Sequence, residues 1–320
     1  ADVVVLSTAD SPKEVTAAWG VPCTGVTSDN NEPQELYVYG KLRINNGYLS
    51  TRFSGGIVFN QLGGEMEVAG GKISARQIRT TQNGTTSYTQ TGGQVELLGG
   101  YTYDTSGTIA TLDDLRNVPI RFLHNNSRLG GYGSFSWIST SNIFKMSGGV
   151  MDIHNSAGNS NALRITSDAS NMESSGGKIN IHLTRNSYYD IQVPNGSIPS
   201  LVIDRTTGTG SARLESNLSI AGDLTLSGSA KLAANSLSYS LEVKGDFNID
   251  ASATYDPNQN NTRFTGDTDA QFSVEGTITS NLYNWVIAKD NSTLTVAGAN
   301  GNVTVRNDLQ IVSGRSEERR

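Results

Sequence analysis

A short phrase built around a Gly-Gly pair returns four times along the chain at nearly regular spacing. Its copies occupy residues 59–68, 88–97, 144–153 and 172–181, and their first glycines are separated by 29, 56 and 28 residues. Each copy has a large apolar residue four positions before the first glycine, and two more apolar residues three and five positions after it. This alternation predicts a strand after each glycine corner, and the period predicts a β-solenoid in which successive coils stack.

A second phrase places a glycine, usually followed by Asp, between two apolar pairs. Its copies lie at residues 36–47, 218–228, 241–249 and 303–314, with Asn307 in place of the glycine in the last copy. The apolar alternation continues through the glycine. We therefore expect the glycine to take an inward position where the chain bends between two short strands.

Together the two phrases predict an all-β fold, namely a parallel β-helix solenoid. The usual handedness of parallel crossovers predicts right-handed coils. The first 30 residues do not repeat and are expected to cover the open end of the solenoid. Within them Ser11, Pro12 and Glu14 match a helix-capping signature and Gly20 matches a helix end, which predicts a short helix from Pro12 to Trp19.

The phrases also divide the chain into segments. The cap or leader covers residues 1–30, the Gly-Gly repeats of about 28 residues cover 31–213, the Gly-Asp repeats cover 214–314, and a charged tail covers 315–320. Residues 101–140 interrupt the rhythm, and such interruptions are where binding loops are commonly carried.

Composition restricts the classes of partner. The chain of 320 residues has 36 % hydrophobic residues, 35 glycines and a net charge of −6. No basic stripe is present, which argues against nucleic acid, and no apolar stretch is long enough to span a membrane. The single Cys23 cannot form an internal disulfide. The Ser-, Thr- and Asn-rich composition favours a secreted protein whose signal peptide has been removed.

An outward column of mostly acidic residues is predicted from the Gly-Gly phrases. Glu67, Glu96, Asp152 and Asn180 stand at the same position of the four copies. Adjacent coils would stack two carboxylates about 5 Å apart. That separation suits a retaining glycosidase, which makes Glu67, Glu96 and Asp152 candidate catalytic residues, and it also suits a bound cation. A solvated surface column is the alternative interpretation.

Two histidines recur in register as well. His154 and His182 each follow the second glycine of their phrase by five residues, and His124 lies further upstream. Stacked imidazoles could share a metal ion or titrate as a coupled pair. A pair of surface or interface histidines is the alternative.

One oxygen-rich segment partly matches a calcium-binding loop. Asp256, Asn258 and Asn260 match its start, and Asp267 stands at its twelfth position. The sixth position is Asn261 instead of glycine, so a polar turn between strands is the alternative. No cofactor is indicated apart from Ca²⁺ at this segment.

Aromatic residues fall into two groups. Phe59, Tyr88 and Phe144 share one position of the Gly-Gly phrase and predict a stacked ladder in the core. Other aromatic residues are candidates for stacking on a sugar ring at the surface. These candidates are Tyr101, Tyr103, Tyr132, Trp137, Tyr188 and Tyr189.

Three segments near the C-terminus, at 262–276, 282–287 and 303–314, follow a longer pattern. It reads Phe-x-Gly, Gln-x-x-x-x-Gly, aromatic-Asn and then an apolar alternation through a glycine or Asn. This string resembles a repeat of large secreted surface proteins of Bacteroidota, covering about 214–314 well and 36–185 loosely. Those proteins are adhesins, gliding-associated proteins or surface fibres, often exported by the type IX route. The resemblance therefore implies export to the cell surface.

These features predict a non-catalytic, rod-like structural or adhesive segment of a secreted bacterial cell-surface protein. Its partners would be other protein chains or surface glycans. One alternative is a polysaccharide-active lyase or hydrolase, since parallel β-helices host such enzymes. Another is a subunit of a larger surface or secretion-associated assembly, joined end to end through an apolar last coil near Leu309 and Ile311.

Overall fold

The computed structural model describes most of the chain, with gaps. It covers residues 3–5, 14–19, 35–38, 41–50, 58–61, 65–75, 77–80, 86–97, 101–103, 110–115, 119–123, 135–154, 160–184, 186–235 and 239–316. Predictions that concern Cys23, Gly63, His124 and Tyr132 lie outside the described residues.

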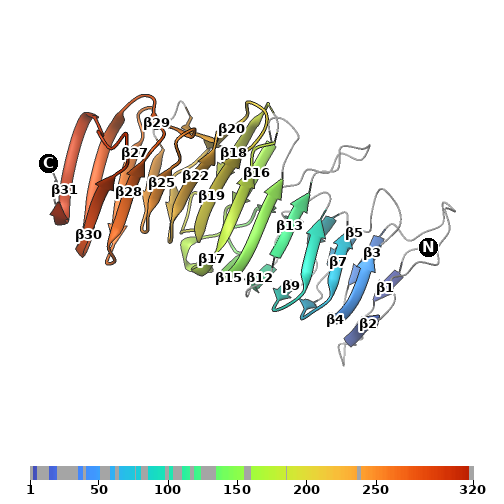
Figure 1. The fold of residues 1–320 in the computed structure, drawn as a ribbon. Helices are drawn as coiled ribbons and strands as arrows, with labels where there is room; N and C mark the ends of the chain where they lie inside the picture. The colour runs from blue at the N-terminus through green and yellow to red at the C-terminus, as the bar shows by residue number, and fades with distance from the viewer. Residues whose placement is uncertain are drawn as a thin grey trace. The chain divides into compact units, whose positions relative to one another are not determined.

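The chain forms two compact units, and each is a solenoid of parallel β-strands (Figure 1). Unit 1 comprises residues 1–155 and 165–177, and unit 2 comprises residues 156–164 and 178–320. This arrangement confirms the predicted parallel β-solenoid. The predicted change of repeat type at 213–214 falls inside unit 2, within the strand Ser211–Leu214.

Each unit contains two parallel sheets, here called sheet 1 and sheet 2. In unit 1, sheet 1 consists of β1 (Val3–Val5), β3 (Glu35–Val38), β5 (Val58–Gln61), β8 (Gln77–Thr80), β11 (Tyr101–Tyr103) and β14 (Phe135–Trp137). Sheet 2 of unit 1 consists of β2 (Glu14–Trp19), β4 (Lys41–Ser50), β6 (Glu65–Val68), β7 (Lys72–Ala75), β9 (Thr86–Gln90), β10 (Gln94–Leu97), β12 (Ala110–Leu115), β13 (Pro119–Leu123) and β15 (Ile143–His154).

Unit 2 repeats this plan. Its sheet 1 consists of β16 (Ser160–Ile165), β18 (Tyr188–Gln192), β20 (Ser211–Leu214), β23 (Lys231–Ala234), β26 (Thr254–Asp256) and β29 (Thr277–Ile278). Its sheet 2 consists of β17 (Met172–His182, which begins in unit 1), β19 (Ser200–Arg205), β21 (Leu218–Ile220), β22 (Leu224–Gly228), β24 (Ser240–Val243), β25 (Phe247–Ile249), β27 (Asn261–Gly266), β28 (Ala270–Val274), β30 (Leu282–Ala297) and β31 (Val305–Ser316).

A single 3₁₀ turn, η1 (Ala169–Asn171), is the helical element among these residues. Within the part of the chain that the structure describes, no helix has the length and hydropathy needed to traverse a bilayer.

Columns of like residues, one from each coil, form the core of unit 2. The strand register places Leu201, Leu224, Phe247 and Phe272 one above the other, and all are buried. The rings of Phe247 and Phe272 stack with their centroids 5.2 Å apart. A coil by itself would expose these side chains, so burial against its neighbours is what stabilises it.

The aromatic ladder predicted in unit 1 is confirmed in part. One column of sheet 2 comprises Leu42, Met66, Tyr88, Leu112 and Phe144, of which Leu42, Met66, Tyr88 and Phe144 are buried. Tyr88 and Phe144 therefore share a column, with one coil between them. Phe59 pairs with Ile78 in sheet 1 instead, so the prediction is wrong for Phe59.

The misplacement of Phe59 has a simple origin. The glycine pair Gly92–Gly93 lies over Gly70–Gly71, because a Cβ at Gly92 would come within 2.0 Å of the carbonyl oxygen of Ala69. In the sequence, position 63 stands between β5 and β6, so the pair that the prediction aligned with Gly92–Gly93 is not the pair 70–71 that lies against it. The coils here repeat after 22 residues, from position 70 to position 92, and the predicted 29-residue step is wrong.

The N-terminal segment predicted to be helical is a strand. β2 pairs in parallel with β4, with Val15 beside Leu42 and Ala17 beside Ile44. Because this segment alternates with a period of two residues, it can form a continuous ladder of backbone hydrogen bonds with β4. The capping signature offers only hydrogen bonds within the segment itself. The predicted helix from Pro12 to Trp19 is therefore wrong.

The Gly-Asp phrase marks a corner between two short strands, as predicted. Gly222 lies between β21 and β22, and Gly245 lies between β24 and β25. A Cβ at Gly245 would lie 2.2 Å from Oδ1 of Asp223 in the preceding coil. It would also lie 2.8 and 2.9 Å from the backbone carbonyl carbon and oxygen of Gly222. Glycine is thus required because the backbone of the preceding coil occupies the space of a side chain.

In the last copy of this phrase, the second apolar pair occupies the columns that the first apolar pair occupies in the earlier copies of unit 2. Leu309 pairs with Trp285 and Ile311 pairs with Ile287, in the column that continues from β21. Because the earlier copies place their second apolar pair in the column of β22 and β25, the predicted alignment of residues 303–314 is wrong.

Candidate functional site

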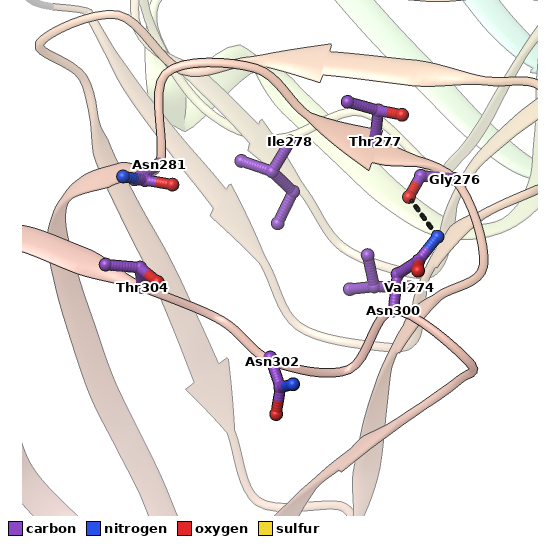
Figure 2. Close-up of a pocket in the computed structure, with 8 residues that line it drawn as sticks. All are labelled: Val274, Gly276, Thr277, Ile278, Asn281, Asn300, Asn302 and Thr304. Carbon is purple, nitrogen blue, oxygen red and sulfur yellow. Dashed lines mark hydrogen bonds between the residues drawn. The ribbon is translucent and has the colours of Figure 1, made fainter.

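A pocket of about 290 Å³ opens at the C-terminal end of unit 2. Figure 2 shows it between β29, which carries Ile278, and the segment that carries Asn302 and Thr304. Its apolar lining residues are Ile278, which is partly exposed, and Val274, which is buried; hydroxyl and amide groups supply the rest.

The pocket exists because no further strand is laid against β29. Each earlier strand of sheet 1 in unit 2 is followed by a parallel neighbour in the next coil, but residues 298–304 contain no strand. The side-chain amide of Asn300 donates hydrogen bonds to the backbone oxygens of Glu275 and Gly276, at 2.9 and 3.0 Å, and Figure 2 marks the bond to Gly276. These two bonds anchor the segment at one end of the pocket.

Apart from Asn300, the polar side chains of the lining are free to bind a ligand. Those of Thr277, Asn281, Asn302 and Thr304 make no hydrogen bond to another residue that the structure describes. Asn281 is held with a positive φ of 57°, a conformation that asparagine tolerates better than most residues. None of the eight lining residues is ionisable.

The backbone of β29 adds a further polar group. The N–H groups of Thr277 and Thr279 donate backward to the preceding coil, to the oxygens of Ala253 and Tyr255. Since successive residues of a strand point their N–H and C=O groups to opposite sides, those of Ile278 face the pocket side.

A second polar cluster lies on the outward face of sheet 1 in unit 2. Arg213 donates to both carboxylate oxygens of Asp190, at 2.9 and 3.1 Å, and its Nε also lies 2.9 Å from Glu215. The hydrogen bond that Arg213 donates to Asp190 raises the pKa of Arg213 above its ordinary value. The guanidinium carbon lies 4.5 Å from the centroid of the Tyr188 ring, so this half-exposed ring is held against a fixed cation.

The candidate carboxylates are not gathered in one place. Glu67 lies in the column of Arg43 and forms ion pairs with Arg43 and Lys41, at 3.2 and 3.4 Å. Glu96 lies in a different column of sheet 2 and forms an ion pair with Lys72 at 2.9 Å. The structure therefore does not place Glu67 and Glu96 at the separation that a retaining glycosidase needs.

Glu96 and Asp152 do share a column, but they are not neighbours. Arg121 pairs with Glu96 on one side and with Asp152 on the other. Two strand spacings, about 10 Å, therefore separate the two acidic residues. Asn180 lies in unit 2, beside Val202.

The two histidines lie in different units. His154 ends β15 in unit 1, opposite Leu123. In unit 2, Nδ1 of His182 lies 2.7 Å from Oδ1 of Asp204, and Ser227 follows Asp204 in the same column. A Ser-His-Asp relay requires the serine to contact the histidine, whereas here the aspartate stands between them.

The residues of the calcium-like segment are separated by a strand. Asp256 forms an ion pair with Lys231 at 3.3 Å and accepts a hydrogen bond from Ser280. Asn260 is buried, and its Oδ1 accepts a hydrogen bond from Thr262. β27 then runs from Asn261 to Gly266, so about 20 Å of extended chain separates Asp256 from Asp267.

The remaining members of this segment also have structural roles. Asn258 donates to the backbone oxygen of Asn235 across one coil, while Asp267 is exposed in the turn after β27. Among the described residues, no group of three or more His, Cys, Asp or Glu side chains is placed to hold a metal ion.

Of the aromatic candidates, Tyr188 is the one that the structure shows at the surface. Trp137 and Tyr189 are buried, and the Tyr189 hydroxyl accepts a hydrogen bond from the N–H of Thr184. Their predicted surface role is therefore wrong, because both point into the core of their unit. Tyr101 and Tyr103 lie in β11, and their side chains are outside the described part of the structure.

Apolar residues of β31 are exposed. Leu309, Ile311 and Val312 are 50 %, 48 % and 68 % exposed. Leu309 and Ile311 extend the inward columns of Trp285 and Ile287, both of which are buried. The expected exposure of the last coil is confirmed at these positions.

Sequence reasoning did not select the residues of the pocket. They come from positions 274–281 and 300–304, and no catalytic or binding motif joins them. One signal could have identified the region: Gly298-Ala-Asn300-Gly301-Asn302 is rich in turn residues at the place where the repeat requires a strand.

Comparison of the chain with protein-family models, with curated proteins and with solved structures finds no match.

Proposed function

We propose that this chain is a non-catalytic structural and adhesive segment of a secreted bacterial cell-surface protein. The observation that carries the proposal is the way side chains of one coil accept hydrogen bonds from the backbone of the next. A stack of coils joined in this way is suited to bearing load and to presenting binding surfaces.

These inter-coil bonds recur through unit 2. In each of them a side-chain oxygen accepts from a backbone N–H one coil further on, at a distance between 2.7 and 3.0 Å. The acceptor and donor pairs are Asn186 and Thr209, Ser200 and Asp223, Asn217 and Ser240, Asp223 and Asp246, Asp246 and Gln271, and Asp269 and Thr293.

A ladder of amide side chains runs along the same unit. The amide of Asn307 donates to Oδ1 of Asn284 at 2.7 Å, and that of Asn284 donates to Oδ1 of Asn261. Asn261 in turn donates to Ser240. Each bond of this kind contributes about 1 kcal/mol net, and separating two coils requires breaking it together with the strand ladder.

Single-molecule force spectroscopy of the full chain tests the structural part of the proposal. With the chain pulled from its two ends, we expect unit 2 to lose whole coils, in steps of about 8 nm for 23 residues. Asp223→Ala removes the acceptor for the N–H of Asp246, so the force needed to release that coil should fall.

Two variants serve as controls. Asp223→Asn keeps an oxygen acceptor at the same position and should retain most of the unfolding force. Asp267→Ala removes an exposed carboxylate and should leave the force unchanged. If Asp223→Ala unfolds at the same force as Asp267→Ala, the inter-coil bonds do not bear load and the structural proposal fails.

The adhesive part of the proposal concerns partners, namely surface glycans or other protein chains. The exposed apolar residues of β31 support end-to-end joining with another chain, since they continue columns that are buried in every earlier coil of the register. Export to the cell surface, including the type IX route, belongs to the same proposal. Protease treatment of intact producing cells should remove the chain if it is displayed there.

A polysaccharide-cleaving activity is the competing hypothesis. It is tested by incubating the purified chain with neutral and uronic-acid polysaccharides and measuring new reducing ends and unsaturated sugar products. Turnover that is lost in Glu67→Gln, Glu96→Gln or Asp152→Asn would overturn the non-catalytic proposal.

A further inference from the structure

We propose that the pocket beside β29 binds a neutral saccharide unit. This inference rests on the adhesive part of the proposed function, for which it names a site and a ligand class. It is carried by the size of the pocket, by the pairing of an apolar side with polar groups, and by the neutral lining.

The size of the pocket limits the ligand to one or two sugar rings. Its volume of about 290 Å³ lies at the lower end of the range found for small-molecule sites. The pocket is open to solvent on one side, where Asn281, Asn302 and Thr304 are exposed. A ring at the end of a longer glycan could therefore enter while the remainder of the glycan stays outside.

The lining matches the two kinds of surface that a sugar ring presents. The partly exposed Ile278 offers apolar contact to the C–H face of a pyranose, whereas Val274 is buried. Asn281 and Asn302 each carry both a donor and an acceptor, as adjacent hydroxyl groups of a sugar require. The N–H and C=O groups of Ile278 supply a further donor and acceptor on the same side.

The charge of the lining favours neutral ligands over ionic ones. A phosphate, sulfate or carboxylate bound here would lose water without gaining a cationic partner, because no lining residue is ionisable. Hydroxyl groups pair with the amide and threonine side chains at no such cost.

An extended peptide fits the site less well. Strand addition needs a run of free N–H and C=O groups along a sheet edge. β29 has two residues, and Ile278 alone turns its backbone groups toward the pocket. The segment carrying Asn302 already runs along that side, as Figure 2 shows.

Two features hold the pocket in shape before a ligand arrives. Asn300 is fixed by its bonds to the oxygens of Glu275 and Gly276. Gly298 begins the segment with a φ of 107°, and a Cβ there would lie 2.4 Å from the oxygen of Val274. A fixed segment loses little entropy on binding, which favours affinity for a small ligand.

The test uses the full chain on an array of immobilised neutral and acidic oligosaccharides, followed by calorimetry with the strongest neutral binder. We expect neutral hexose or N-acetylhexosamine oligosaccharides to bind above background and acidic ones not to. Asn302→Ala and Thr277→Val should each weaken binding about tenfold, which corresponds to the loss of one hydrogen bond.

Thr295→Val is the matched control, because Thr295 is exposed on β30 and does not line the pocket. It should bind as tightly as the unchanged chain. No neutral binder on the array, equal binding of acidic glycans, or binding unaffected by Asn302→Ala would each overturn the inference. If no neutral glycan binds on the array, the force measurement on Asp223→Ala can still support the structural part of the proposed function. Failure of the saccharide inference and failure of the structural proposal can therefore be told apart.

Discussion

The ammonium group of Lys289 in β30 donates a hydrogen bond to the backbone oxygen of Lys244, which lies two coils earlier (2.8 Å). It donates a second one to the oxygen of Thr265 in the coil between them (2.9 Å). The Lys289 side chain is buried, so a single cation joins three consecutive coils from inside unit 2. Burial lowers the pKa of Lys289, and the charges of nearby aspartates partly offset this effect.

Lys289→Met should lower the free energy of unfolding of unit 2 by about 2 kcal/mol, because two buried carbonyl groups lose their donor. Lys244→Met is the control, since the Lys244 side chain is exposed and only its backbone oxygen takes part. Urea unfolding followed by circular dichroism measures both variants. Equal stability of the two would show that the buried ammonium is not needed.

The same lysine predicts a pH dependence. Its pKa in the folded state lies below the ordinary value of 10.5, so between these values the unfolded chain binds more protons than the folded chain. Beyond its hydrogen bonds, the pH-dependent part of the stability that Lys289 contributes is therefore fully present above 10.5 and is lost as pH falls through the folded pKa. Urea unfolding at rising alkaline pH should show the unchanged chain gaining stability relative to Lys289→Met, and a falling difference would contradict the assignment.

Two glycines with positive φ should respond differently to alanine. A Cβ at Gly228 would lie 2.5 Å from the backbone oxygen of Arg205, whereas a Cβ at Gly266 would meet nothing closer than 3.5 Å. Gly266→Ala should cost about 1 kcal/mol through backbone strain alone. Gly228→Ala should cost about 3 kcal/mol, because the clash adds to the strain. Thermal unfolding of the two variants gives the comparison, and equal losses would refute the role of the close contact.

Arg213→Lys should destabilise unit 2 by about 1 kcal/mol, although it preserves the charge. A lysine cannot donate to both oxygens of the buried Asp190 or lie flat against Tyr188. Arg263→Lys is the matched control, because Arg263 lies 3.8 Å from Glu242 in a more exposed pair and should contribute little. Chemical unfolding at low and high salt separates the effect of shape from the effect of charge.

End-to-end joining predicts self-association through β31. We expect sedimentation velocity to show concentration-dependent oligomers of the chain, and Ile311→Lys to shift them to monomers, because a second copy would bury this half-exposed side chain. Gln310→Lys, on the adjacent position of the same strand, should leave association unchanged. A chain that stays monomeric at all concentrations would refute joining between copies.

The fold could be predicted because burial imposes the same alternation on every coil. Leu224 and Phe247 follow the apolar positions of the Gly-Asp phrase and were visible as a repeat, and the structure continues their column to Phe272. The error in the 29-residue step arose because a Gly-Gly pair in the sequence does not tell which pair it stacks on. The strand register, which places Gly92 over Gly70, depends on contacts with neighbouring coils.

The candidate sites were harder to predict, for a related reason. Stacking decides which outward residues become neighbours, and one misplaced coil moves Glu67 into a column apart from Glu96. The pocket depends on a strand that fails to form between Gly298 and Thr304. No short motif encodes such an omission, and its sign in the sequence is the run of turn residues from Gly298 to Asn302.

The asparagine ladder of unit 2 has a consequence for how such a chain can change in length. Asn261, Asn284 and Asn307 follow one another at steps of 23 residues, each amide bonding the one before. A duplication or deletion of one complete step would return every donor to an equivalent acceptor, whereas a change of a few residues would break the ladder from that point onward. The length of the protein is therefore free to evolve in whole coils, and a gene encoding it would tolerate recombination between repeats far better than small insertions.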